Sequence, residues 1–576
     1  MVIKKFVFSI TFFFSLFFLG SCQPEGAVVE GPVLTSSTPV NDATGVGTVT
    51  TLILNFSERF TLIDNPQITL NGAVVSAALT YKKLTISTPL TGSTDYTLEI
   101  PAKTLFNDAG NPNKRIQLHF TTIAGVSNNG VVFEAETATL SGNAVVATSY
   151  SGYTGTGYVS SGDGNLTFNI SVEQNGFYEL AVRFNTTGNK RVNDLSVDGV
   201  KIGSMNFEPV SNWTTLQAGK IHLTAGNHTL SIVKNWGYTA YDYIVLTLDT
   251  VGLIPFQIAS NLVTPNPSLQ VVHLYNFLKE NFGIKVLSGT AAAHSTNINE
   301  AIWVHDQTGK WPAITCFDFI DHTWKDQNWV NYSAPFTLGQ DWWNNNGIVS
   351  LMWHWRDPLT KSGSMYTYSS SNTSGTTFDL SKIADTTSNE YKAMIVDLDV
   401  IAGYLKEFKN ANIPVLWRPL HEASGTWFWW GAKGPEPCKT LWKLMYNRFV
   451  KVHGLNNLIW VWTSDVAEDA TTWYPGDDYV DIIGMDIYPG ENQHQSQYFS
   501  FNKIREMFGG RKLITLSECG SIPDPNLMKL NGDMWSYFMP WNGDYTRSDA
   551  HNGANWWKAL FANDLVVTRD EMPNLK

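Results

Sequence analysis

The apolar residues of this chain follow two rhythms, and the change between them falls near residue 250. Before that point short stretches alternate apolar and polar residues, as at 51–56 and 96–100. Clusters of Gly, Asn and Pro separate these stretches. Alternation with a period of two is typical of half-buried strands. We therefore predict two all-β domains, at residues 34–124 and 131–250, after a polar tether over 22–33.

From residue 254 to 576 longer apolar runs alternate with helical patterns. In the clearest helical pattern, at 391–408, Met394, Leu398, Ile401 and Leu405 recur every three or four residues. Continuous apolar strands alternating with helices indicate a parallel sheet, and eight of them predict a (β/α)₈ TIM barrel. The eight runs are 285–288, 312–319, 348–355, 414–420, 458–463, 482–487, 513–516 and 537–541.

Two glutamates stand where the chemistry of such a barrel is expected. Glu422 follows the fourth run and Glu518 ends the seventh. Active sites of these barrels lie at the C-terminal ends of the strands, and strands four and seven face each other across the mouth. Two facing carboxylates surrounded by tryptophans can hydrolyse a glycosidic bond. Strand positions do not measure the gap between them, so retaining and inverting mechanisms both stay open here.

Composition narrows the class of partner. The formal charge is −12 and we find no basic run, which excludes nucleic acid and anionic membrane surfaces as expected partners. Acidic polysaccharides would also be repelled, so we expect a neutral substrate. Of 22 tryptophans only Trp213 and Trp236 precede residue 250, which agrees with a sugar site in the C-terminal half. Motifs of zinc proteases, nucleotide-binding loops and serine hydrolases are absent.

The first residues predict an export signal. Lys4 and Lys5 precede an almost wholly apolar stretch, 6–19, that is short for a membrane span. Leu19-Gly20-Ser21-Cys22 resembles the lipobox of bacterial lipoproteins, in which the cysteine is lipidated after removal of residues 1–21. We therefore expect a lipid anchor on Cys22, at the outer membrane or cell surface of a Gram-negative bacterium.

The other cysteines give no disulfide framework. Cys316, Cys438 and Cys519 are an odd set spread over the barrel. One pair, or three buried thiols, would satisfy the pattern. We expect the chain to act as a monomer.

The barrel sequence resembles glycoside hydrolase family 26. The resemblance rests on Trp417-Arg418-Pro419-Leu420-His421-Glu422, on Trp427-Phe428-Trp429-Trp430-Gly431 and on Ser517-Glu518. Two further motifs, 308–313 and 353–355, also match. The family has a (β/α)₈ barrel, needs no cofactor for catalysis and works by retaining double displacement. Most members are endo-β-1,4-mannanases, and a few act on β-1,3-xylan or mixed-linkage β-glucan.

This resemblance assigns roles to individual residues. Glu422 corresponds to the acid/base and Glu518 to the nucleophile. Tyr488 corresponds to the donor that orients Glu518. The remaining substrate-binding candidates are His354, His421, Arg418, Trp427 and Trp541. Trp353 and Trp355 flank His354 but point to the opposite side of the strand, where we expect packing.

The two N-terminal domains also resemble known families. Residues 39–58 are similar to a bacterial Ig-like domain, which we expect to serve as a spacer. The segment that runs from Glu134 and Glu136 to Asp242 is similar to carbohydrate-binding modules of families 6 and 35, which are β-sandwiches. That resemblance makes these three acids candidate ligands of a structural calcium, in line with the hard oxygen ligands that calcium prefers. It makes Tyr158, Asn235 and Trp236 candidate glycan contacts.

Several alternatives stay open at this stage. Leu420, Ala423, Ser424 and Cys519 depart from the commoner family pattern beside the carboxylates. The substrate could therefore be mannan, galactomannan or glucomannan, or instead mixed-linkage β-glucan or β-1,3-xylan. Endo and exo action are both open. A different class of protein, a non-catalytic lipoprotein that captures glycans, is a further hypothesis.

Overall fold

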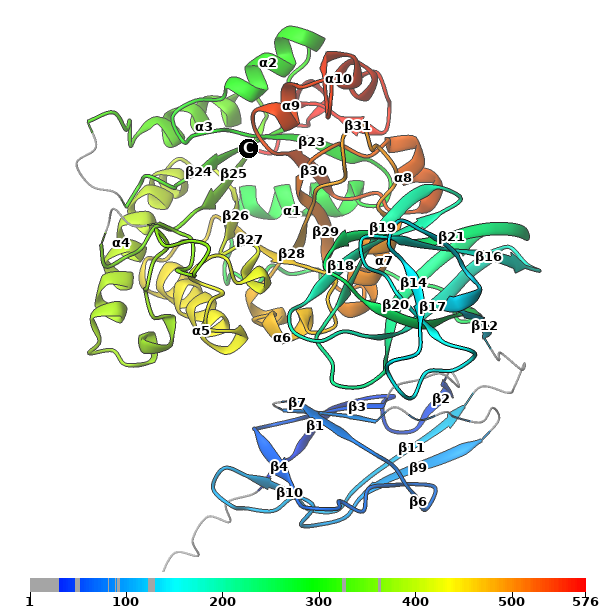
Figure 1. Cartoon of the computed structure of the whole chain (residues 1–576). Coiled ribbons are helices and arrows are strands. Elements are labelled where there is room, and N and C mark those ends of the chain that lie inside the picture. Colours follow the sequence, from blue (N-terminus) through cyan, green and yellow to red (C-terminus); the bar gives the residue numbers. More distant parts are fainter. Residues whose placement is uncertain are drawn as a thin grey trace, which may run out of the picture. The chain divides into compact units, whose positions relative to one another are not determined.

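A computed structural model describes residues 31–46, 52–80, 82–86, 88, 90, 94–122, 130–323, 328–360 and 364–576. The chain divides into two compact units, one ending at residue 129 and the other spanning Gly130–Lys576 (Figure 1). The predicted export signal and Cys22 lie outside the described residues. Among the described helices, none combines the length and apolar character that a membrane span requires.

The first unit is all-β, as predicted. Its strands form two larger sheets, β1-β3-β8-β7 and β2-β11-β9-β5-β6, and a separate pair, β10-β4. Alternate residues of β3 and β9 point into a shared apolar core. The strands are β1 (Leu34–Thr38), β2 (Ala43–Val46), β3 (Leu52–Phe56), β4 (Phe60–Leu62), β5 (Thr69–Leu70), β6 (Ala73–Val74), β7 (Ala78–Thr80), β8 (Lys83–Ile86), β9 (Asp95–Ile100), β10 (Leu105–Asn107) and β11 (Ile116–Thr122).

The second unit begins with a β-sandwich, called the module below. One sheet has the order β14-β15-β22-β17-β20 with β12 beside β22, and the other has the order β13-β16-β21-β18-β19. Leu180, Leu195, Leu230 and Ile244 are fully buried in its core. The elements are β12 (Val131–Glu134), η1 (Ala135–Thr137), β13 (Thr139–Ser141), β14 (Val145–Ala147), β15 (Tyr158–Ser160), β16 (Asn165–Val172), β17 (Gly176–Asn185), β18 (Arg191–Val197), β19 (Val200–Phe207), β20 (Thr214–Leu223), β21 (Gly226–Trp236) and β22 (Ala240–Leu248).

The rest of the second unit is a closed parallel barrel. Its strands follow the order β24-β25-β26-β27-β28-β29-β30-β23, and pairing of β23 with β24 closes the ring. The strands are β23 (Val286–Ala291), β24 (Ile314–Asp318), β25 (Ile348–Trp353), β26 (Val415–Pro419), β27 (Leu458–Ser464), β28 (Ile482–Ile487), β29 (Leu513–Cys519), β30 (Tyr537–Pro540) and the short β31 (Val566–Val567). Each of the eight predicted runs overlaps one barrel strand, although β23, β27 and β29 extend beyond the predicted ends, so the predicted fold is confirmed.

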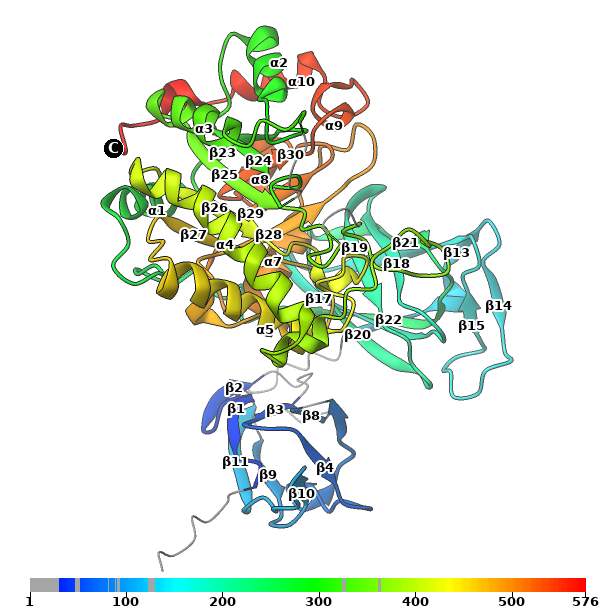
Figure 2. The same cartoon turned by 90° about the vertical axis from the view of Figure 1, so that its left-hand side faces the viewer.

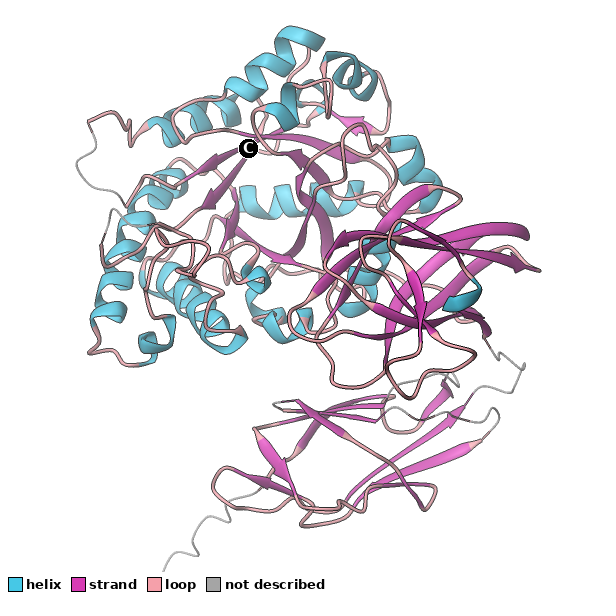
Figure 3. Cartoon of the chain, viewed as in Figure 1, coloured by secondary structure: helices cyan, strands magenta, loops and turns pink. Residues whose placement is uncertain are grey.

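Helices surround the barrel strands, whereas the module is almost entirely strand (Figure 3). They are α1 (Leu269–Asn281), α2 (Asn299–Thr308), α3 (Ala334–Asn344), α4 (Asn389–Asn410), α5 (Pro435–Tyr446), α6 (Ala470–Trp473), α7 (Tyr498–Met507), α8 (Pro525–Asn531), α9 (Asp544–Arg547) and α10 (Ala554–Phe561). Short turns of other helix types are η2 (Leu380–Ala384), η3 (Ala423–Gly425), η4 (Asn447–Val452), η5 (Asp477–Tyr479) and η6 (Arg569–Glu571).

The barrel core explains both the apolar runs and the helical periodicity. Every residue of β25, β26, β27 and β29 is buried, because helices cover one side of each strand and the barrel interior the other. The four periodic residues predicted for 391–408 are the fully buried face of α4. Cys316, Cys438 and Cys519 are buried free thiols.

Candidate active site

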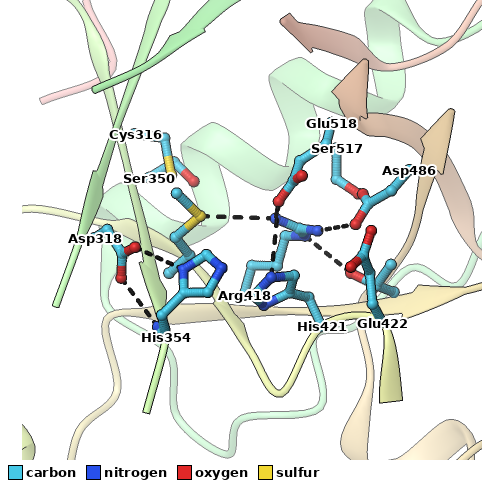
Figure 4. A network of polar contacts seen from close by, with 12 residues as sticks. Cys316, Asp318, Ser350, His354, Arg418, His421, Glu422, Asp486, Ser517 and Glu518 are labelled. Atoms are coloured by element: carbon cyan, nitrogen blue, oxygen red, sulfur yellow. Dashed lines mark hydrogen bonds and ion pairs between the residues drawn. The ribbon is translucent and has the colours of Figure 1, made fainter. Parts of the chain in front are cut away.

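The buried guanidinium of Arg418 organises the mouth of the barrel. Arg418 lies on β26, and its Nη1 donates to Oε1 of Glu518 at 2.7 Å. Its Nη2 pairs with Asp486, and its Nε donates to Oγ1 of Thr463 at 2.9 Å (Figure 4). Burial opposes the positive charge, but Asp486 and Glu518 outweigh it and raise the pKa of Arg418. A cation buried this deeply needs such partners, so Arg418 ties strands β26, β28 and β29 together.

Glu518 is held from two sides. Its Oε1 accepts from Arg418, and its Oε2 accepts from the hydroxyl of Tyr488 at 2.6 Å. Glu518 is buried on β29, and Tyr488 directly follows β28. These two donors fix the plane of the carboxylate and complement a negative charge. The geometry is that of an oriented nucleophile.

Glu422 has a different environment. The chain leaves β26 through a turn in which Leu420 and Glu422 have φ values of 53° and 52°, a left-handed conformation that is unfavourable for residues other than glycine. Nε1 of Trp427 donates to Oε2 of Glu422 at 3.2 Å. Burial and the negative charge of Glu518 raise the pKa of Glu422. A carboxyl that keeps its proton suits a general acid.

The two glutamates lie close together. One carboxylate oxygen from each of Glu422, Asp486 and Glu518 lies within 4.8 Å of the others. Retaining glycosidases place their two carboxyl groups about 5–5.5 Å apart, and inverting ones about 6.5–9.5 Å apart. The narrow gap between Glu422 and Glu518 favours direct attack on the sugar over attack by an intervening water.

Two histidines form one wall of the site. The rings of His354 and His421 meet edge to face, with centroids 4.4 Å apart. Burial, together with the charges of His354 and Arg418, holds the pKa of His421 well below its usual range. Nε2 of His421 lies 4.0 Å from Oε1 of Glu518, beyond hydrogen-bond distance. His421 is therefore a neutral ring against the nucleophile.

His354 carries a partner of its own. Its backbone NH and its Nδ1 lie 3.0 Å and 2.6 Å from the two oxygens of Asp318, at the end of β24. Burial opposes the charge on His354, but Asp318 outweighs it and raises the pKa of the imidazole. Because the Asp318 carboxylate can only accept, Nδ1 of His354 carries a proton. The other ring nitrogen, Nε2, is then an acceptor in the neutral ring and a donor in the protonated ring.

Aromatic rings line the remainder of the mouth. Trp427 is 48% exposed, and Trp541 is partly buried with its ring 5.8 Å from that of His354. Trp353 and Trp355 stack on each other behind the site and are fully buried, so they pack the core as expected. Flat exposed rings such as Trp427 suit the faces of sugar rings.

The structure adds residues that the sequence did not single out. Asp486 is buried beside Arg418 and accepts from Oγ of Ser517 at 2.8 Å. Burial and the charges of Glu518 and Glu422 raise its pKa well above the usual range, although Arg418 opposes this. Asp486 stands two residues before Tyr488, so the alternation of β28 could have placed both at the mouth. Asp318 closes an apolar run in the same way.

The predicted calcium ligands of the module do converge. Oε2 of Glu134 accepts from Thr154 Oγ1 at 2.8 Å, and Oδ1 of the buried Asp242 accepts from the backbone NH of Thr154, also at 2.8 Å. Burial and the charges of Glu136 and Asp242 raise the pKa of Glu134. Arg183 pairs with the other oxygen of Asp242 and supplies part of the positive charge in this cluster.

Glu136 completes the cluster. Its Oε1 accepts from the backbone NH of Thr156 at 2.6 Å, while its Oε2 is buried without a hydrogen-bond partner in the described part of the chain. A Cβ at Gly155 would lie 2.0 Å from Oε1 of Glu136, so this loop closes on the acids only because glycine stands there. The residues therefore fit a hard cation, whose chemistry would satisfy the orphaned oxygen.

The three predicted glycan contacts of the module differ in their exposure and their partners. Tyr158 is 2% exposed and its hydroxyl bonds to Ser149, so the prediction that Tyr158 contacts a glycan is wrong: its ring belongs to the interior. Trp236 is 54% exposed with the guanidinium of Arg191 5.6 Å from its ring centroid. Nδ2 of Asn235 donates to Oδ1 of Asp194 at 3.0 Å.

Comparison with known families agrees with this architecture. Residues 263–571 match the model of glycosyl hydrolase family 26. Residues 131–249 match carbohydrate binding module family 35, and residues 28–122 match a bacterial Ig-like domain.

Similar proteins cover the module and the barrel together. Mannan endo-1,4-β-mannosidase B of Piromyces sp. is 34% identical over 459 residues, or 77% of each chain. The mannan endo-1,4-β-mannosidase of Thermothelomyces thermophilus is 34% identical over 456 residues, 77% of this chain and 91% of that one. The crystal structure of a Podospora anserina GH26-CBM35 β-(1,4)-mannanase is 34% identical with a TM-score of 0.52, covering 78% of this chain and 99% of that one.

A further solved structure matches the barrel. The β-mannanase of a symbiotic protist of the termite Reticulitermes speratus was crystallised with a gluco-manno-oligosaccharide. It is 40% identical with a TM-score of 0.52, and it covers 56% of this chain and 99% of that one.

The electrostatics of the two glutamates predict a pH effect. Because the charge of Glu518 contributes to the raised pKa of Glu422, Glu518→Gln should lower that pKa towards the ordinary glutamate value. Carboxyl titration by ¹³C NMR measures this directly. In the wild type kcat/KM should fall on the alkaline side as Glu422 loses its proton, at a pH above the usual carboxyl range. An unchanged Glu422 titration in Glu518→Gln would contradict the coupling.

Proposed function

This chain belongs to glycosyl hydrolase family 26, and from that premise we propose that it is a retaining endo-β-1,4-mannanase. The observation that carries the proposal is the pair formed by an oriented Glu518 and a proton-holding Glu422 with oxygens within 4.8 Å. The relatives named as mannan endo-1,4-β-mannosidases support the choice of mannan. We propose mannan, galactomannan or glucomannan as substrates.

The first step forms a covalent glycosyl-enzyme. A carboxylate oxygen of Glu518 attacks the anomeric carbon while Glu422 donates its proton to the glycosidic oxygen, and the carbon–oxygen bond to the leaving sugar breaks. Arg418 and Tyr488 orient the attacking carboxylate. Once the proton has left, Glu422 is an anion beside an ester rather than beside a second carboxylate, which favours its new role as a base.

The second step releases the sugar. Glu422 takes a proton from water, the hydroxyl oxygen attacks the anomeric carbon and the ester bond to Glu518 breaks. The product keeps the configuration of the substrate. His354, held by Asp318, is placed to hydrogen-bond the sugar between the two glutamates through Nε2. Trp427 is placed to stack beneath the leaving sugar.

We further propose that the mature chain is lipid-anchored through Cys22 at the outer membrane or cell surface. The charged start, the apolar stretch and Leu19-Gly20-Ser21-Cys22 support this. The Ig-like domain then serves as a spacer between the anchor and the catalytic unit.

Glu134, Glu136 and Asp242 are proposed to hold a structural calcium in the module. The buried, unpartnered oxygen of Glu136 and the raised pKa of Glu134 support a site that gains from a cation. Bound calcium would neutralise these acids and stiffen the 152–156 loop. Catalysis itself needs no cofactor in this proposal.

Substrate and mechanism are tested together by reducing-sugar release. Galactomannan and glucomannan should be hydrolysed, whereas β-1,3-xylan and mixed-linkage β-glucan should not. Glu518→Ala should nearly abolish turnover, and Glu422→Ala should lower it by about 10²- to 10⁴-fold. Exposed Glu491 provides a matched control, since Glu491→Ala should keep full activity.

A second substrate distinguishes the roles of the two carboxylates. With an aryl leaving group that needs no proton, Glu422→Ala should keep the first step, and Glu518→Ala should not. Sugar release only from β-1,3-xylan or mixed-linkage β-glucan would change the assigned substrate and leave the assigned mechanism unchanged. Binding of mannan without release of any sugar would instead support a glycan-capture protein.

Anchoring is tested by metabolic labelling with a palmitate analogue in a Gram-negative host. The wild-type chain should carry the label and fractionate with membranes. Cys22→Ser should lose both. A labelled Cys22→Ser protein would show that the lipid, if present, is attached elsewhere.

Calcium is tested by differential scanning calorimetry. Calcium added to the chelator-treated chain should raise the Tm of the transition that contains the module, because a ligand bound only to the folded state stabilises it. Glu136→Gln should remove most of that shift. Equal shifts in both proteins would place any calcium elsewhere.

A further inference from the structure

The module and the barrel share a packed apolar joint. Phe499 of α7 is 1% exposed and belongs to the apolar core of the module. It lies over β19 and β20 at Gly203 and Gly219, where a side chain is missing. A Cβ at Gly203 would come within 2.6 Å of the Phe499 ring. The barrel therefore inserts a ring into the module, and two glycines make the room.

Polar contacts lock the same joint. The hydroxyl of Tyr498 accepts from the backbone NH of His222 at 3.3 Å. Nζ of Lys220 lies 2.8 Å from both Asp249 of the module and Glu506 of α7, and its side chain is only 10% exposed. A largely buried ion pair permits few geometries. The module is therefore held in one orientation and does not swing on a tether.

The joint places the module at the edge of the barrel mouth. A helix that follows a strand in a (β/α)₈ barrel begins at the C-terminal end of that strand. Tyr498 and Phe499 are the first two residues of α7, which follows β28 and Tyr488. Strands β19 and β20 of the module pack against α7, which lies beside them in Figures 1 and 2.

A line of contacts leads from the module to the acid/base. Nζ of Lys190 lies 3.9 Å from Oδ2 of Asp465, on the loop after β27. That oxygen accepts from the hydroxyl of Ser424 at 2.7 Å. Ser424 stands two residues after Glu422. The module therefore reaches the side of the mouth from which Glu422 protonates the leaving sugar.

The neighbouring residue points to an exposed aromatic surface. Arg191 follows Lys190, and its guanidinium faces the ring of Trp236. Nε of Arg191 also donates to the carbonyl of Tyr238 at 3.3 Å. The side chains of Trp236 and Tyr238 are 54% and 59% exposed. Two open rings with a guanidinium group beside them suit the faces and hydroxyls of a neutral sugar chain.

We propose that the module loops 186–191 and 235–239 extend the glycan groove of the barrel on its leaving-group side. The occupant is the part of the same neutral β-linked polysaccharide that projects beyond the leaving sugar and Trp427. This inference rests on the proposed mannanase function. The fixed joint makes the module a distal part of one binding groove, so its contribution depends on chain length.

The test uses the full chain and β-1,4-manno-oligosaccharides of increasing length. Trp236→Ala should leave kcat/KM for mannotriose within about twofold of wild type. For the longest oligosaccharides and soluble glucomannan, kcat/KM should fall by about three- to tenfold, because only they reach the module. With an isotope label at the reducing end, cleavage of long substrates should move towards that end as leaving-side binding is lost.

Two variants serve as controls. Tyr150→Ala removes another exposed ring of the module, one that lies outside the loops 186–191 and 235–239 and stacks on Tyr158 with ring centroids 5.2 Å apart. It should keep the length dependence. Trp236→Phe should keep most of the dependence of kcat/KM on oligosaccharide length. Equal effects of Trp236→Ala at all lengths, no effect at any length, or loss of the length dependence in Tyr150→Ala instead would overturn the proposal.

Failure of the proposed function remains distinguishable from failure of this inference. If the wild type hydrolyses no mannan, the function is wrong whatever Trp236 does. Titration calorimetry of the same oligosaccharides with the Glu518→Ala variant measures their affinity for the groove in the absence of hydrolysis. Affinity that rises with length in Glu518→Ala, and stops rising when Trp236→Ala is added, supports the extended groove; parallel curves contradict it.

Discussion

The site depends on one buried cation among three carboxylates. Glu422, Asp486 and Glu518 bring oxygens within 4.8 Å of one another in a setting largely closed to water. Three negative charges would repel strongly there, and each would be costly to desolvate. Arg418 pairs with Asp486 and Glu518 through its planar fork, whereas Glu422 lacks that contact and has a raised pKa. The pKa of Asp486 is also raised, because burial and the charges of Glu518 and Glu422 outweigh Arg418 there. The division into nucleophile and acid follows from which carboxylates Arg418 reaches.

The barrel supplies the rigidity that this arrangement needs. Arg418, Asp486 and Glu518 come from three strands that are buried along all or most of their length. The left-handed turn at Leu420 and Glu422 carries the acid away from the strand axis and towards the nucleophile. Such backbone strain persists only where the surroundings hold it. The core behind the site, with Trp353 stacked on Trp355, provides that support.

The sequence predicts residues whose roles follow from their position along one strand or turn. It does not predict residues whose roles depend on contacts with other strands. The catalytic positions of Glu422 and Glu518 are predictable because each glutamate closes an apolar run beside a turn. Asp318 and Asp486 were not singled out, since their importance comes from His354 and Arg418 on adjacent strands. Tyr158 was misassigned because its burial depends on surrounding rings and on Ser149. The role of Phe499 is not predictable from the sequence of its helix. It depends on contact with Gly203 and Gly219, which lie far earlier in the chain.

The central claim is that Glu518 forms a covalent bond to the sugar while Arg418 and Tyr488 hold it. A 2-deoxy-2-fluoro mannoside with an activated leaving group slows the second step and lets the intermediate accumulate. Mass spectrometry of the digested protein should then find one sugar attached to the peptide that contains Glu518. A label on Glu422 or Asp486, or turnover that inverts the anomeric configuration without a label, would contradict the account.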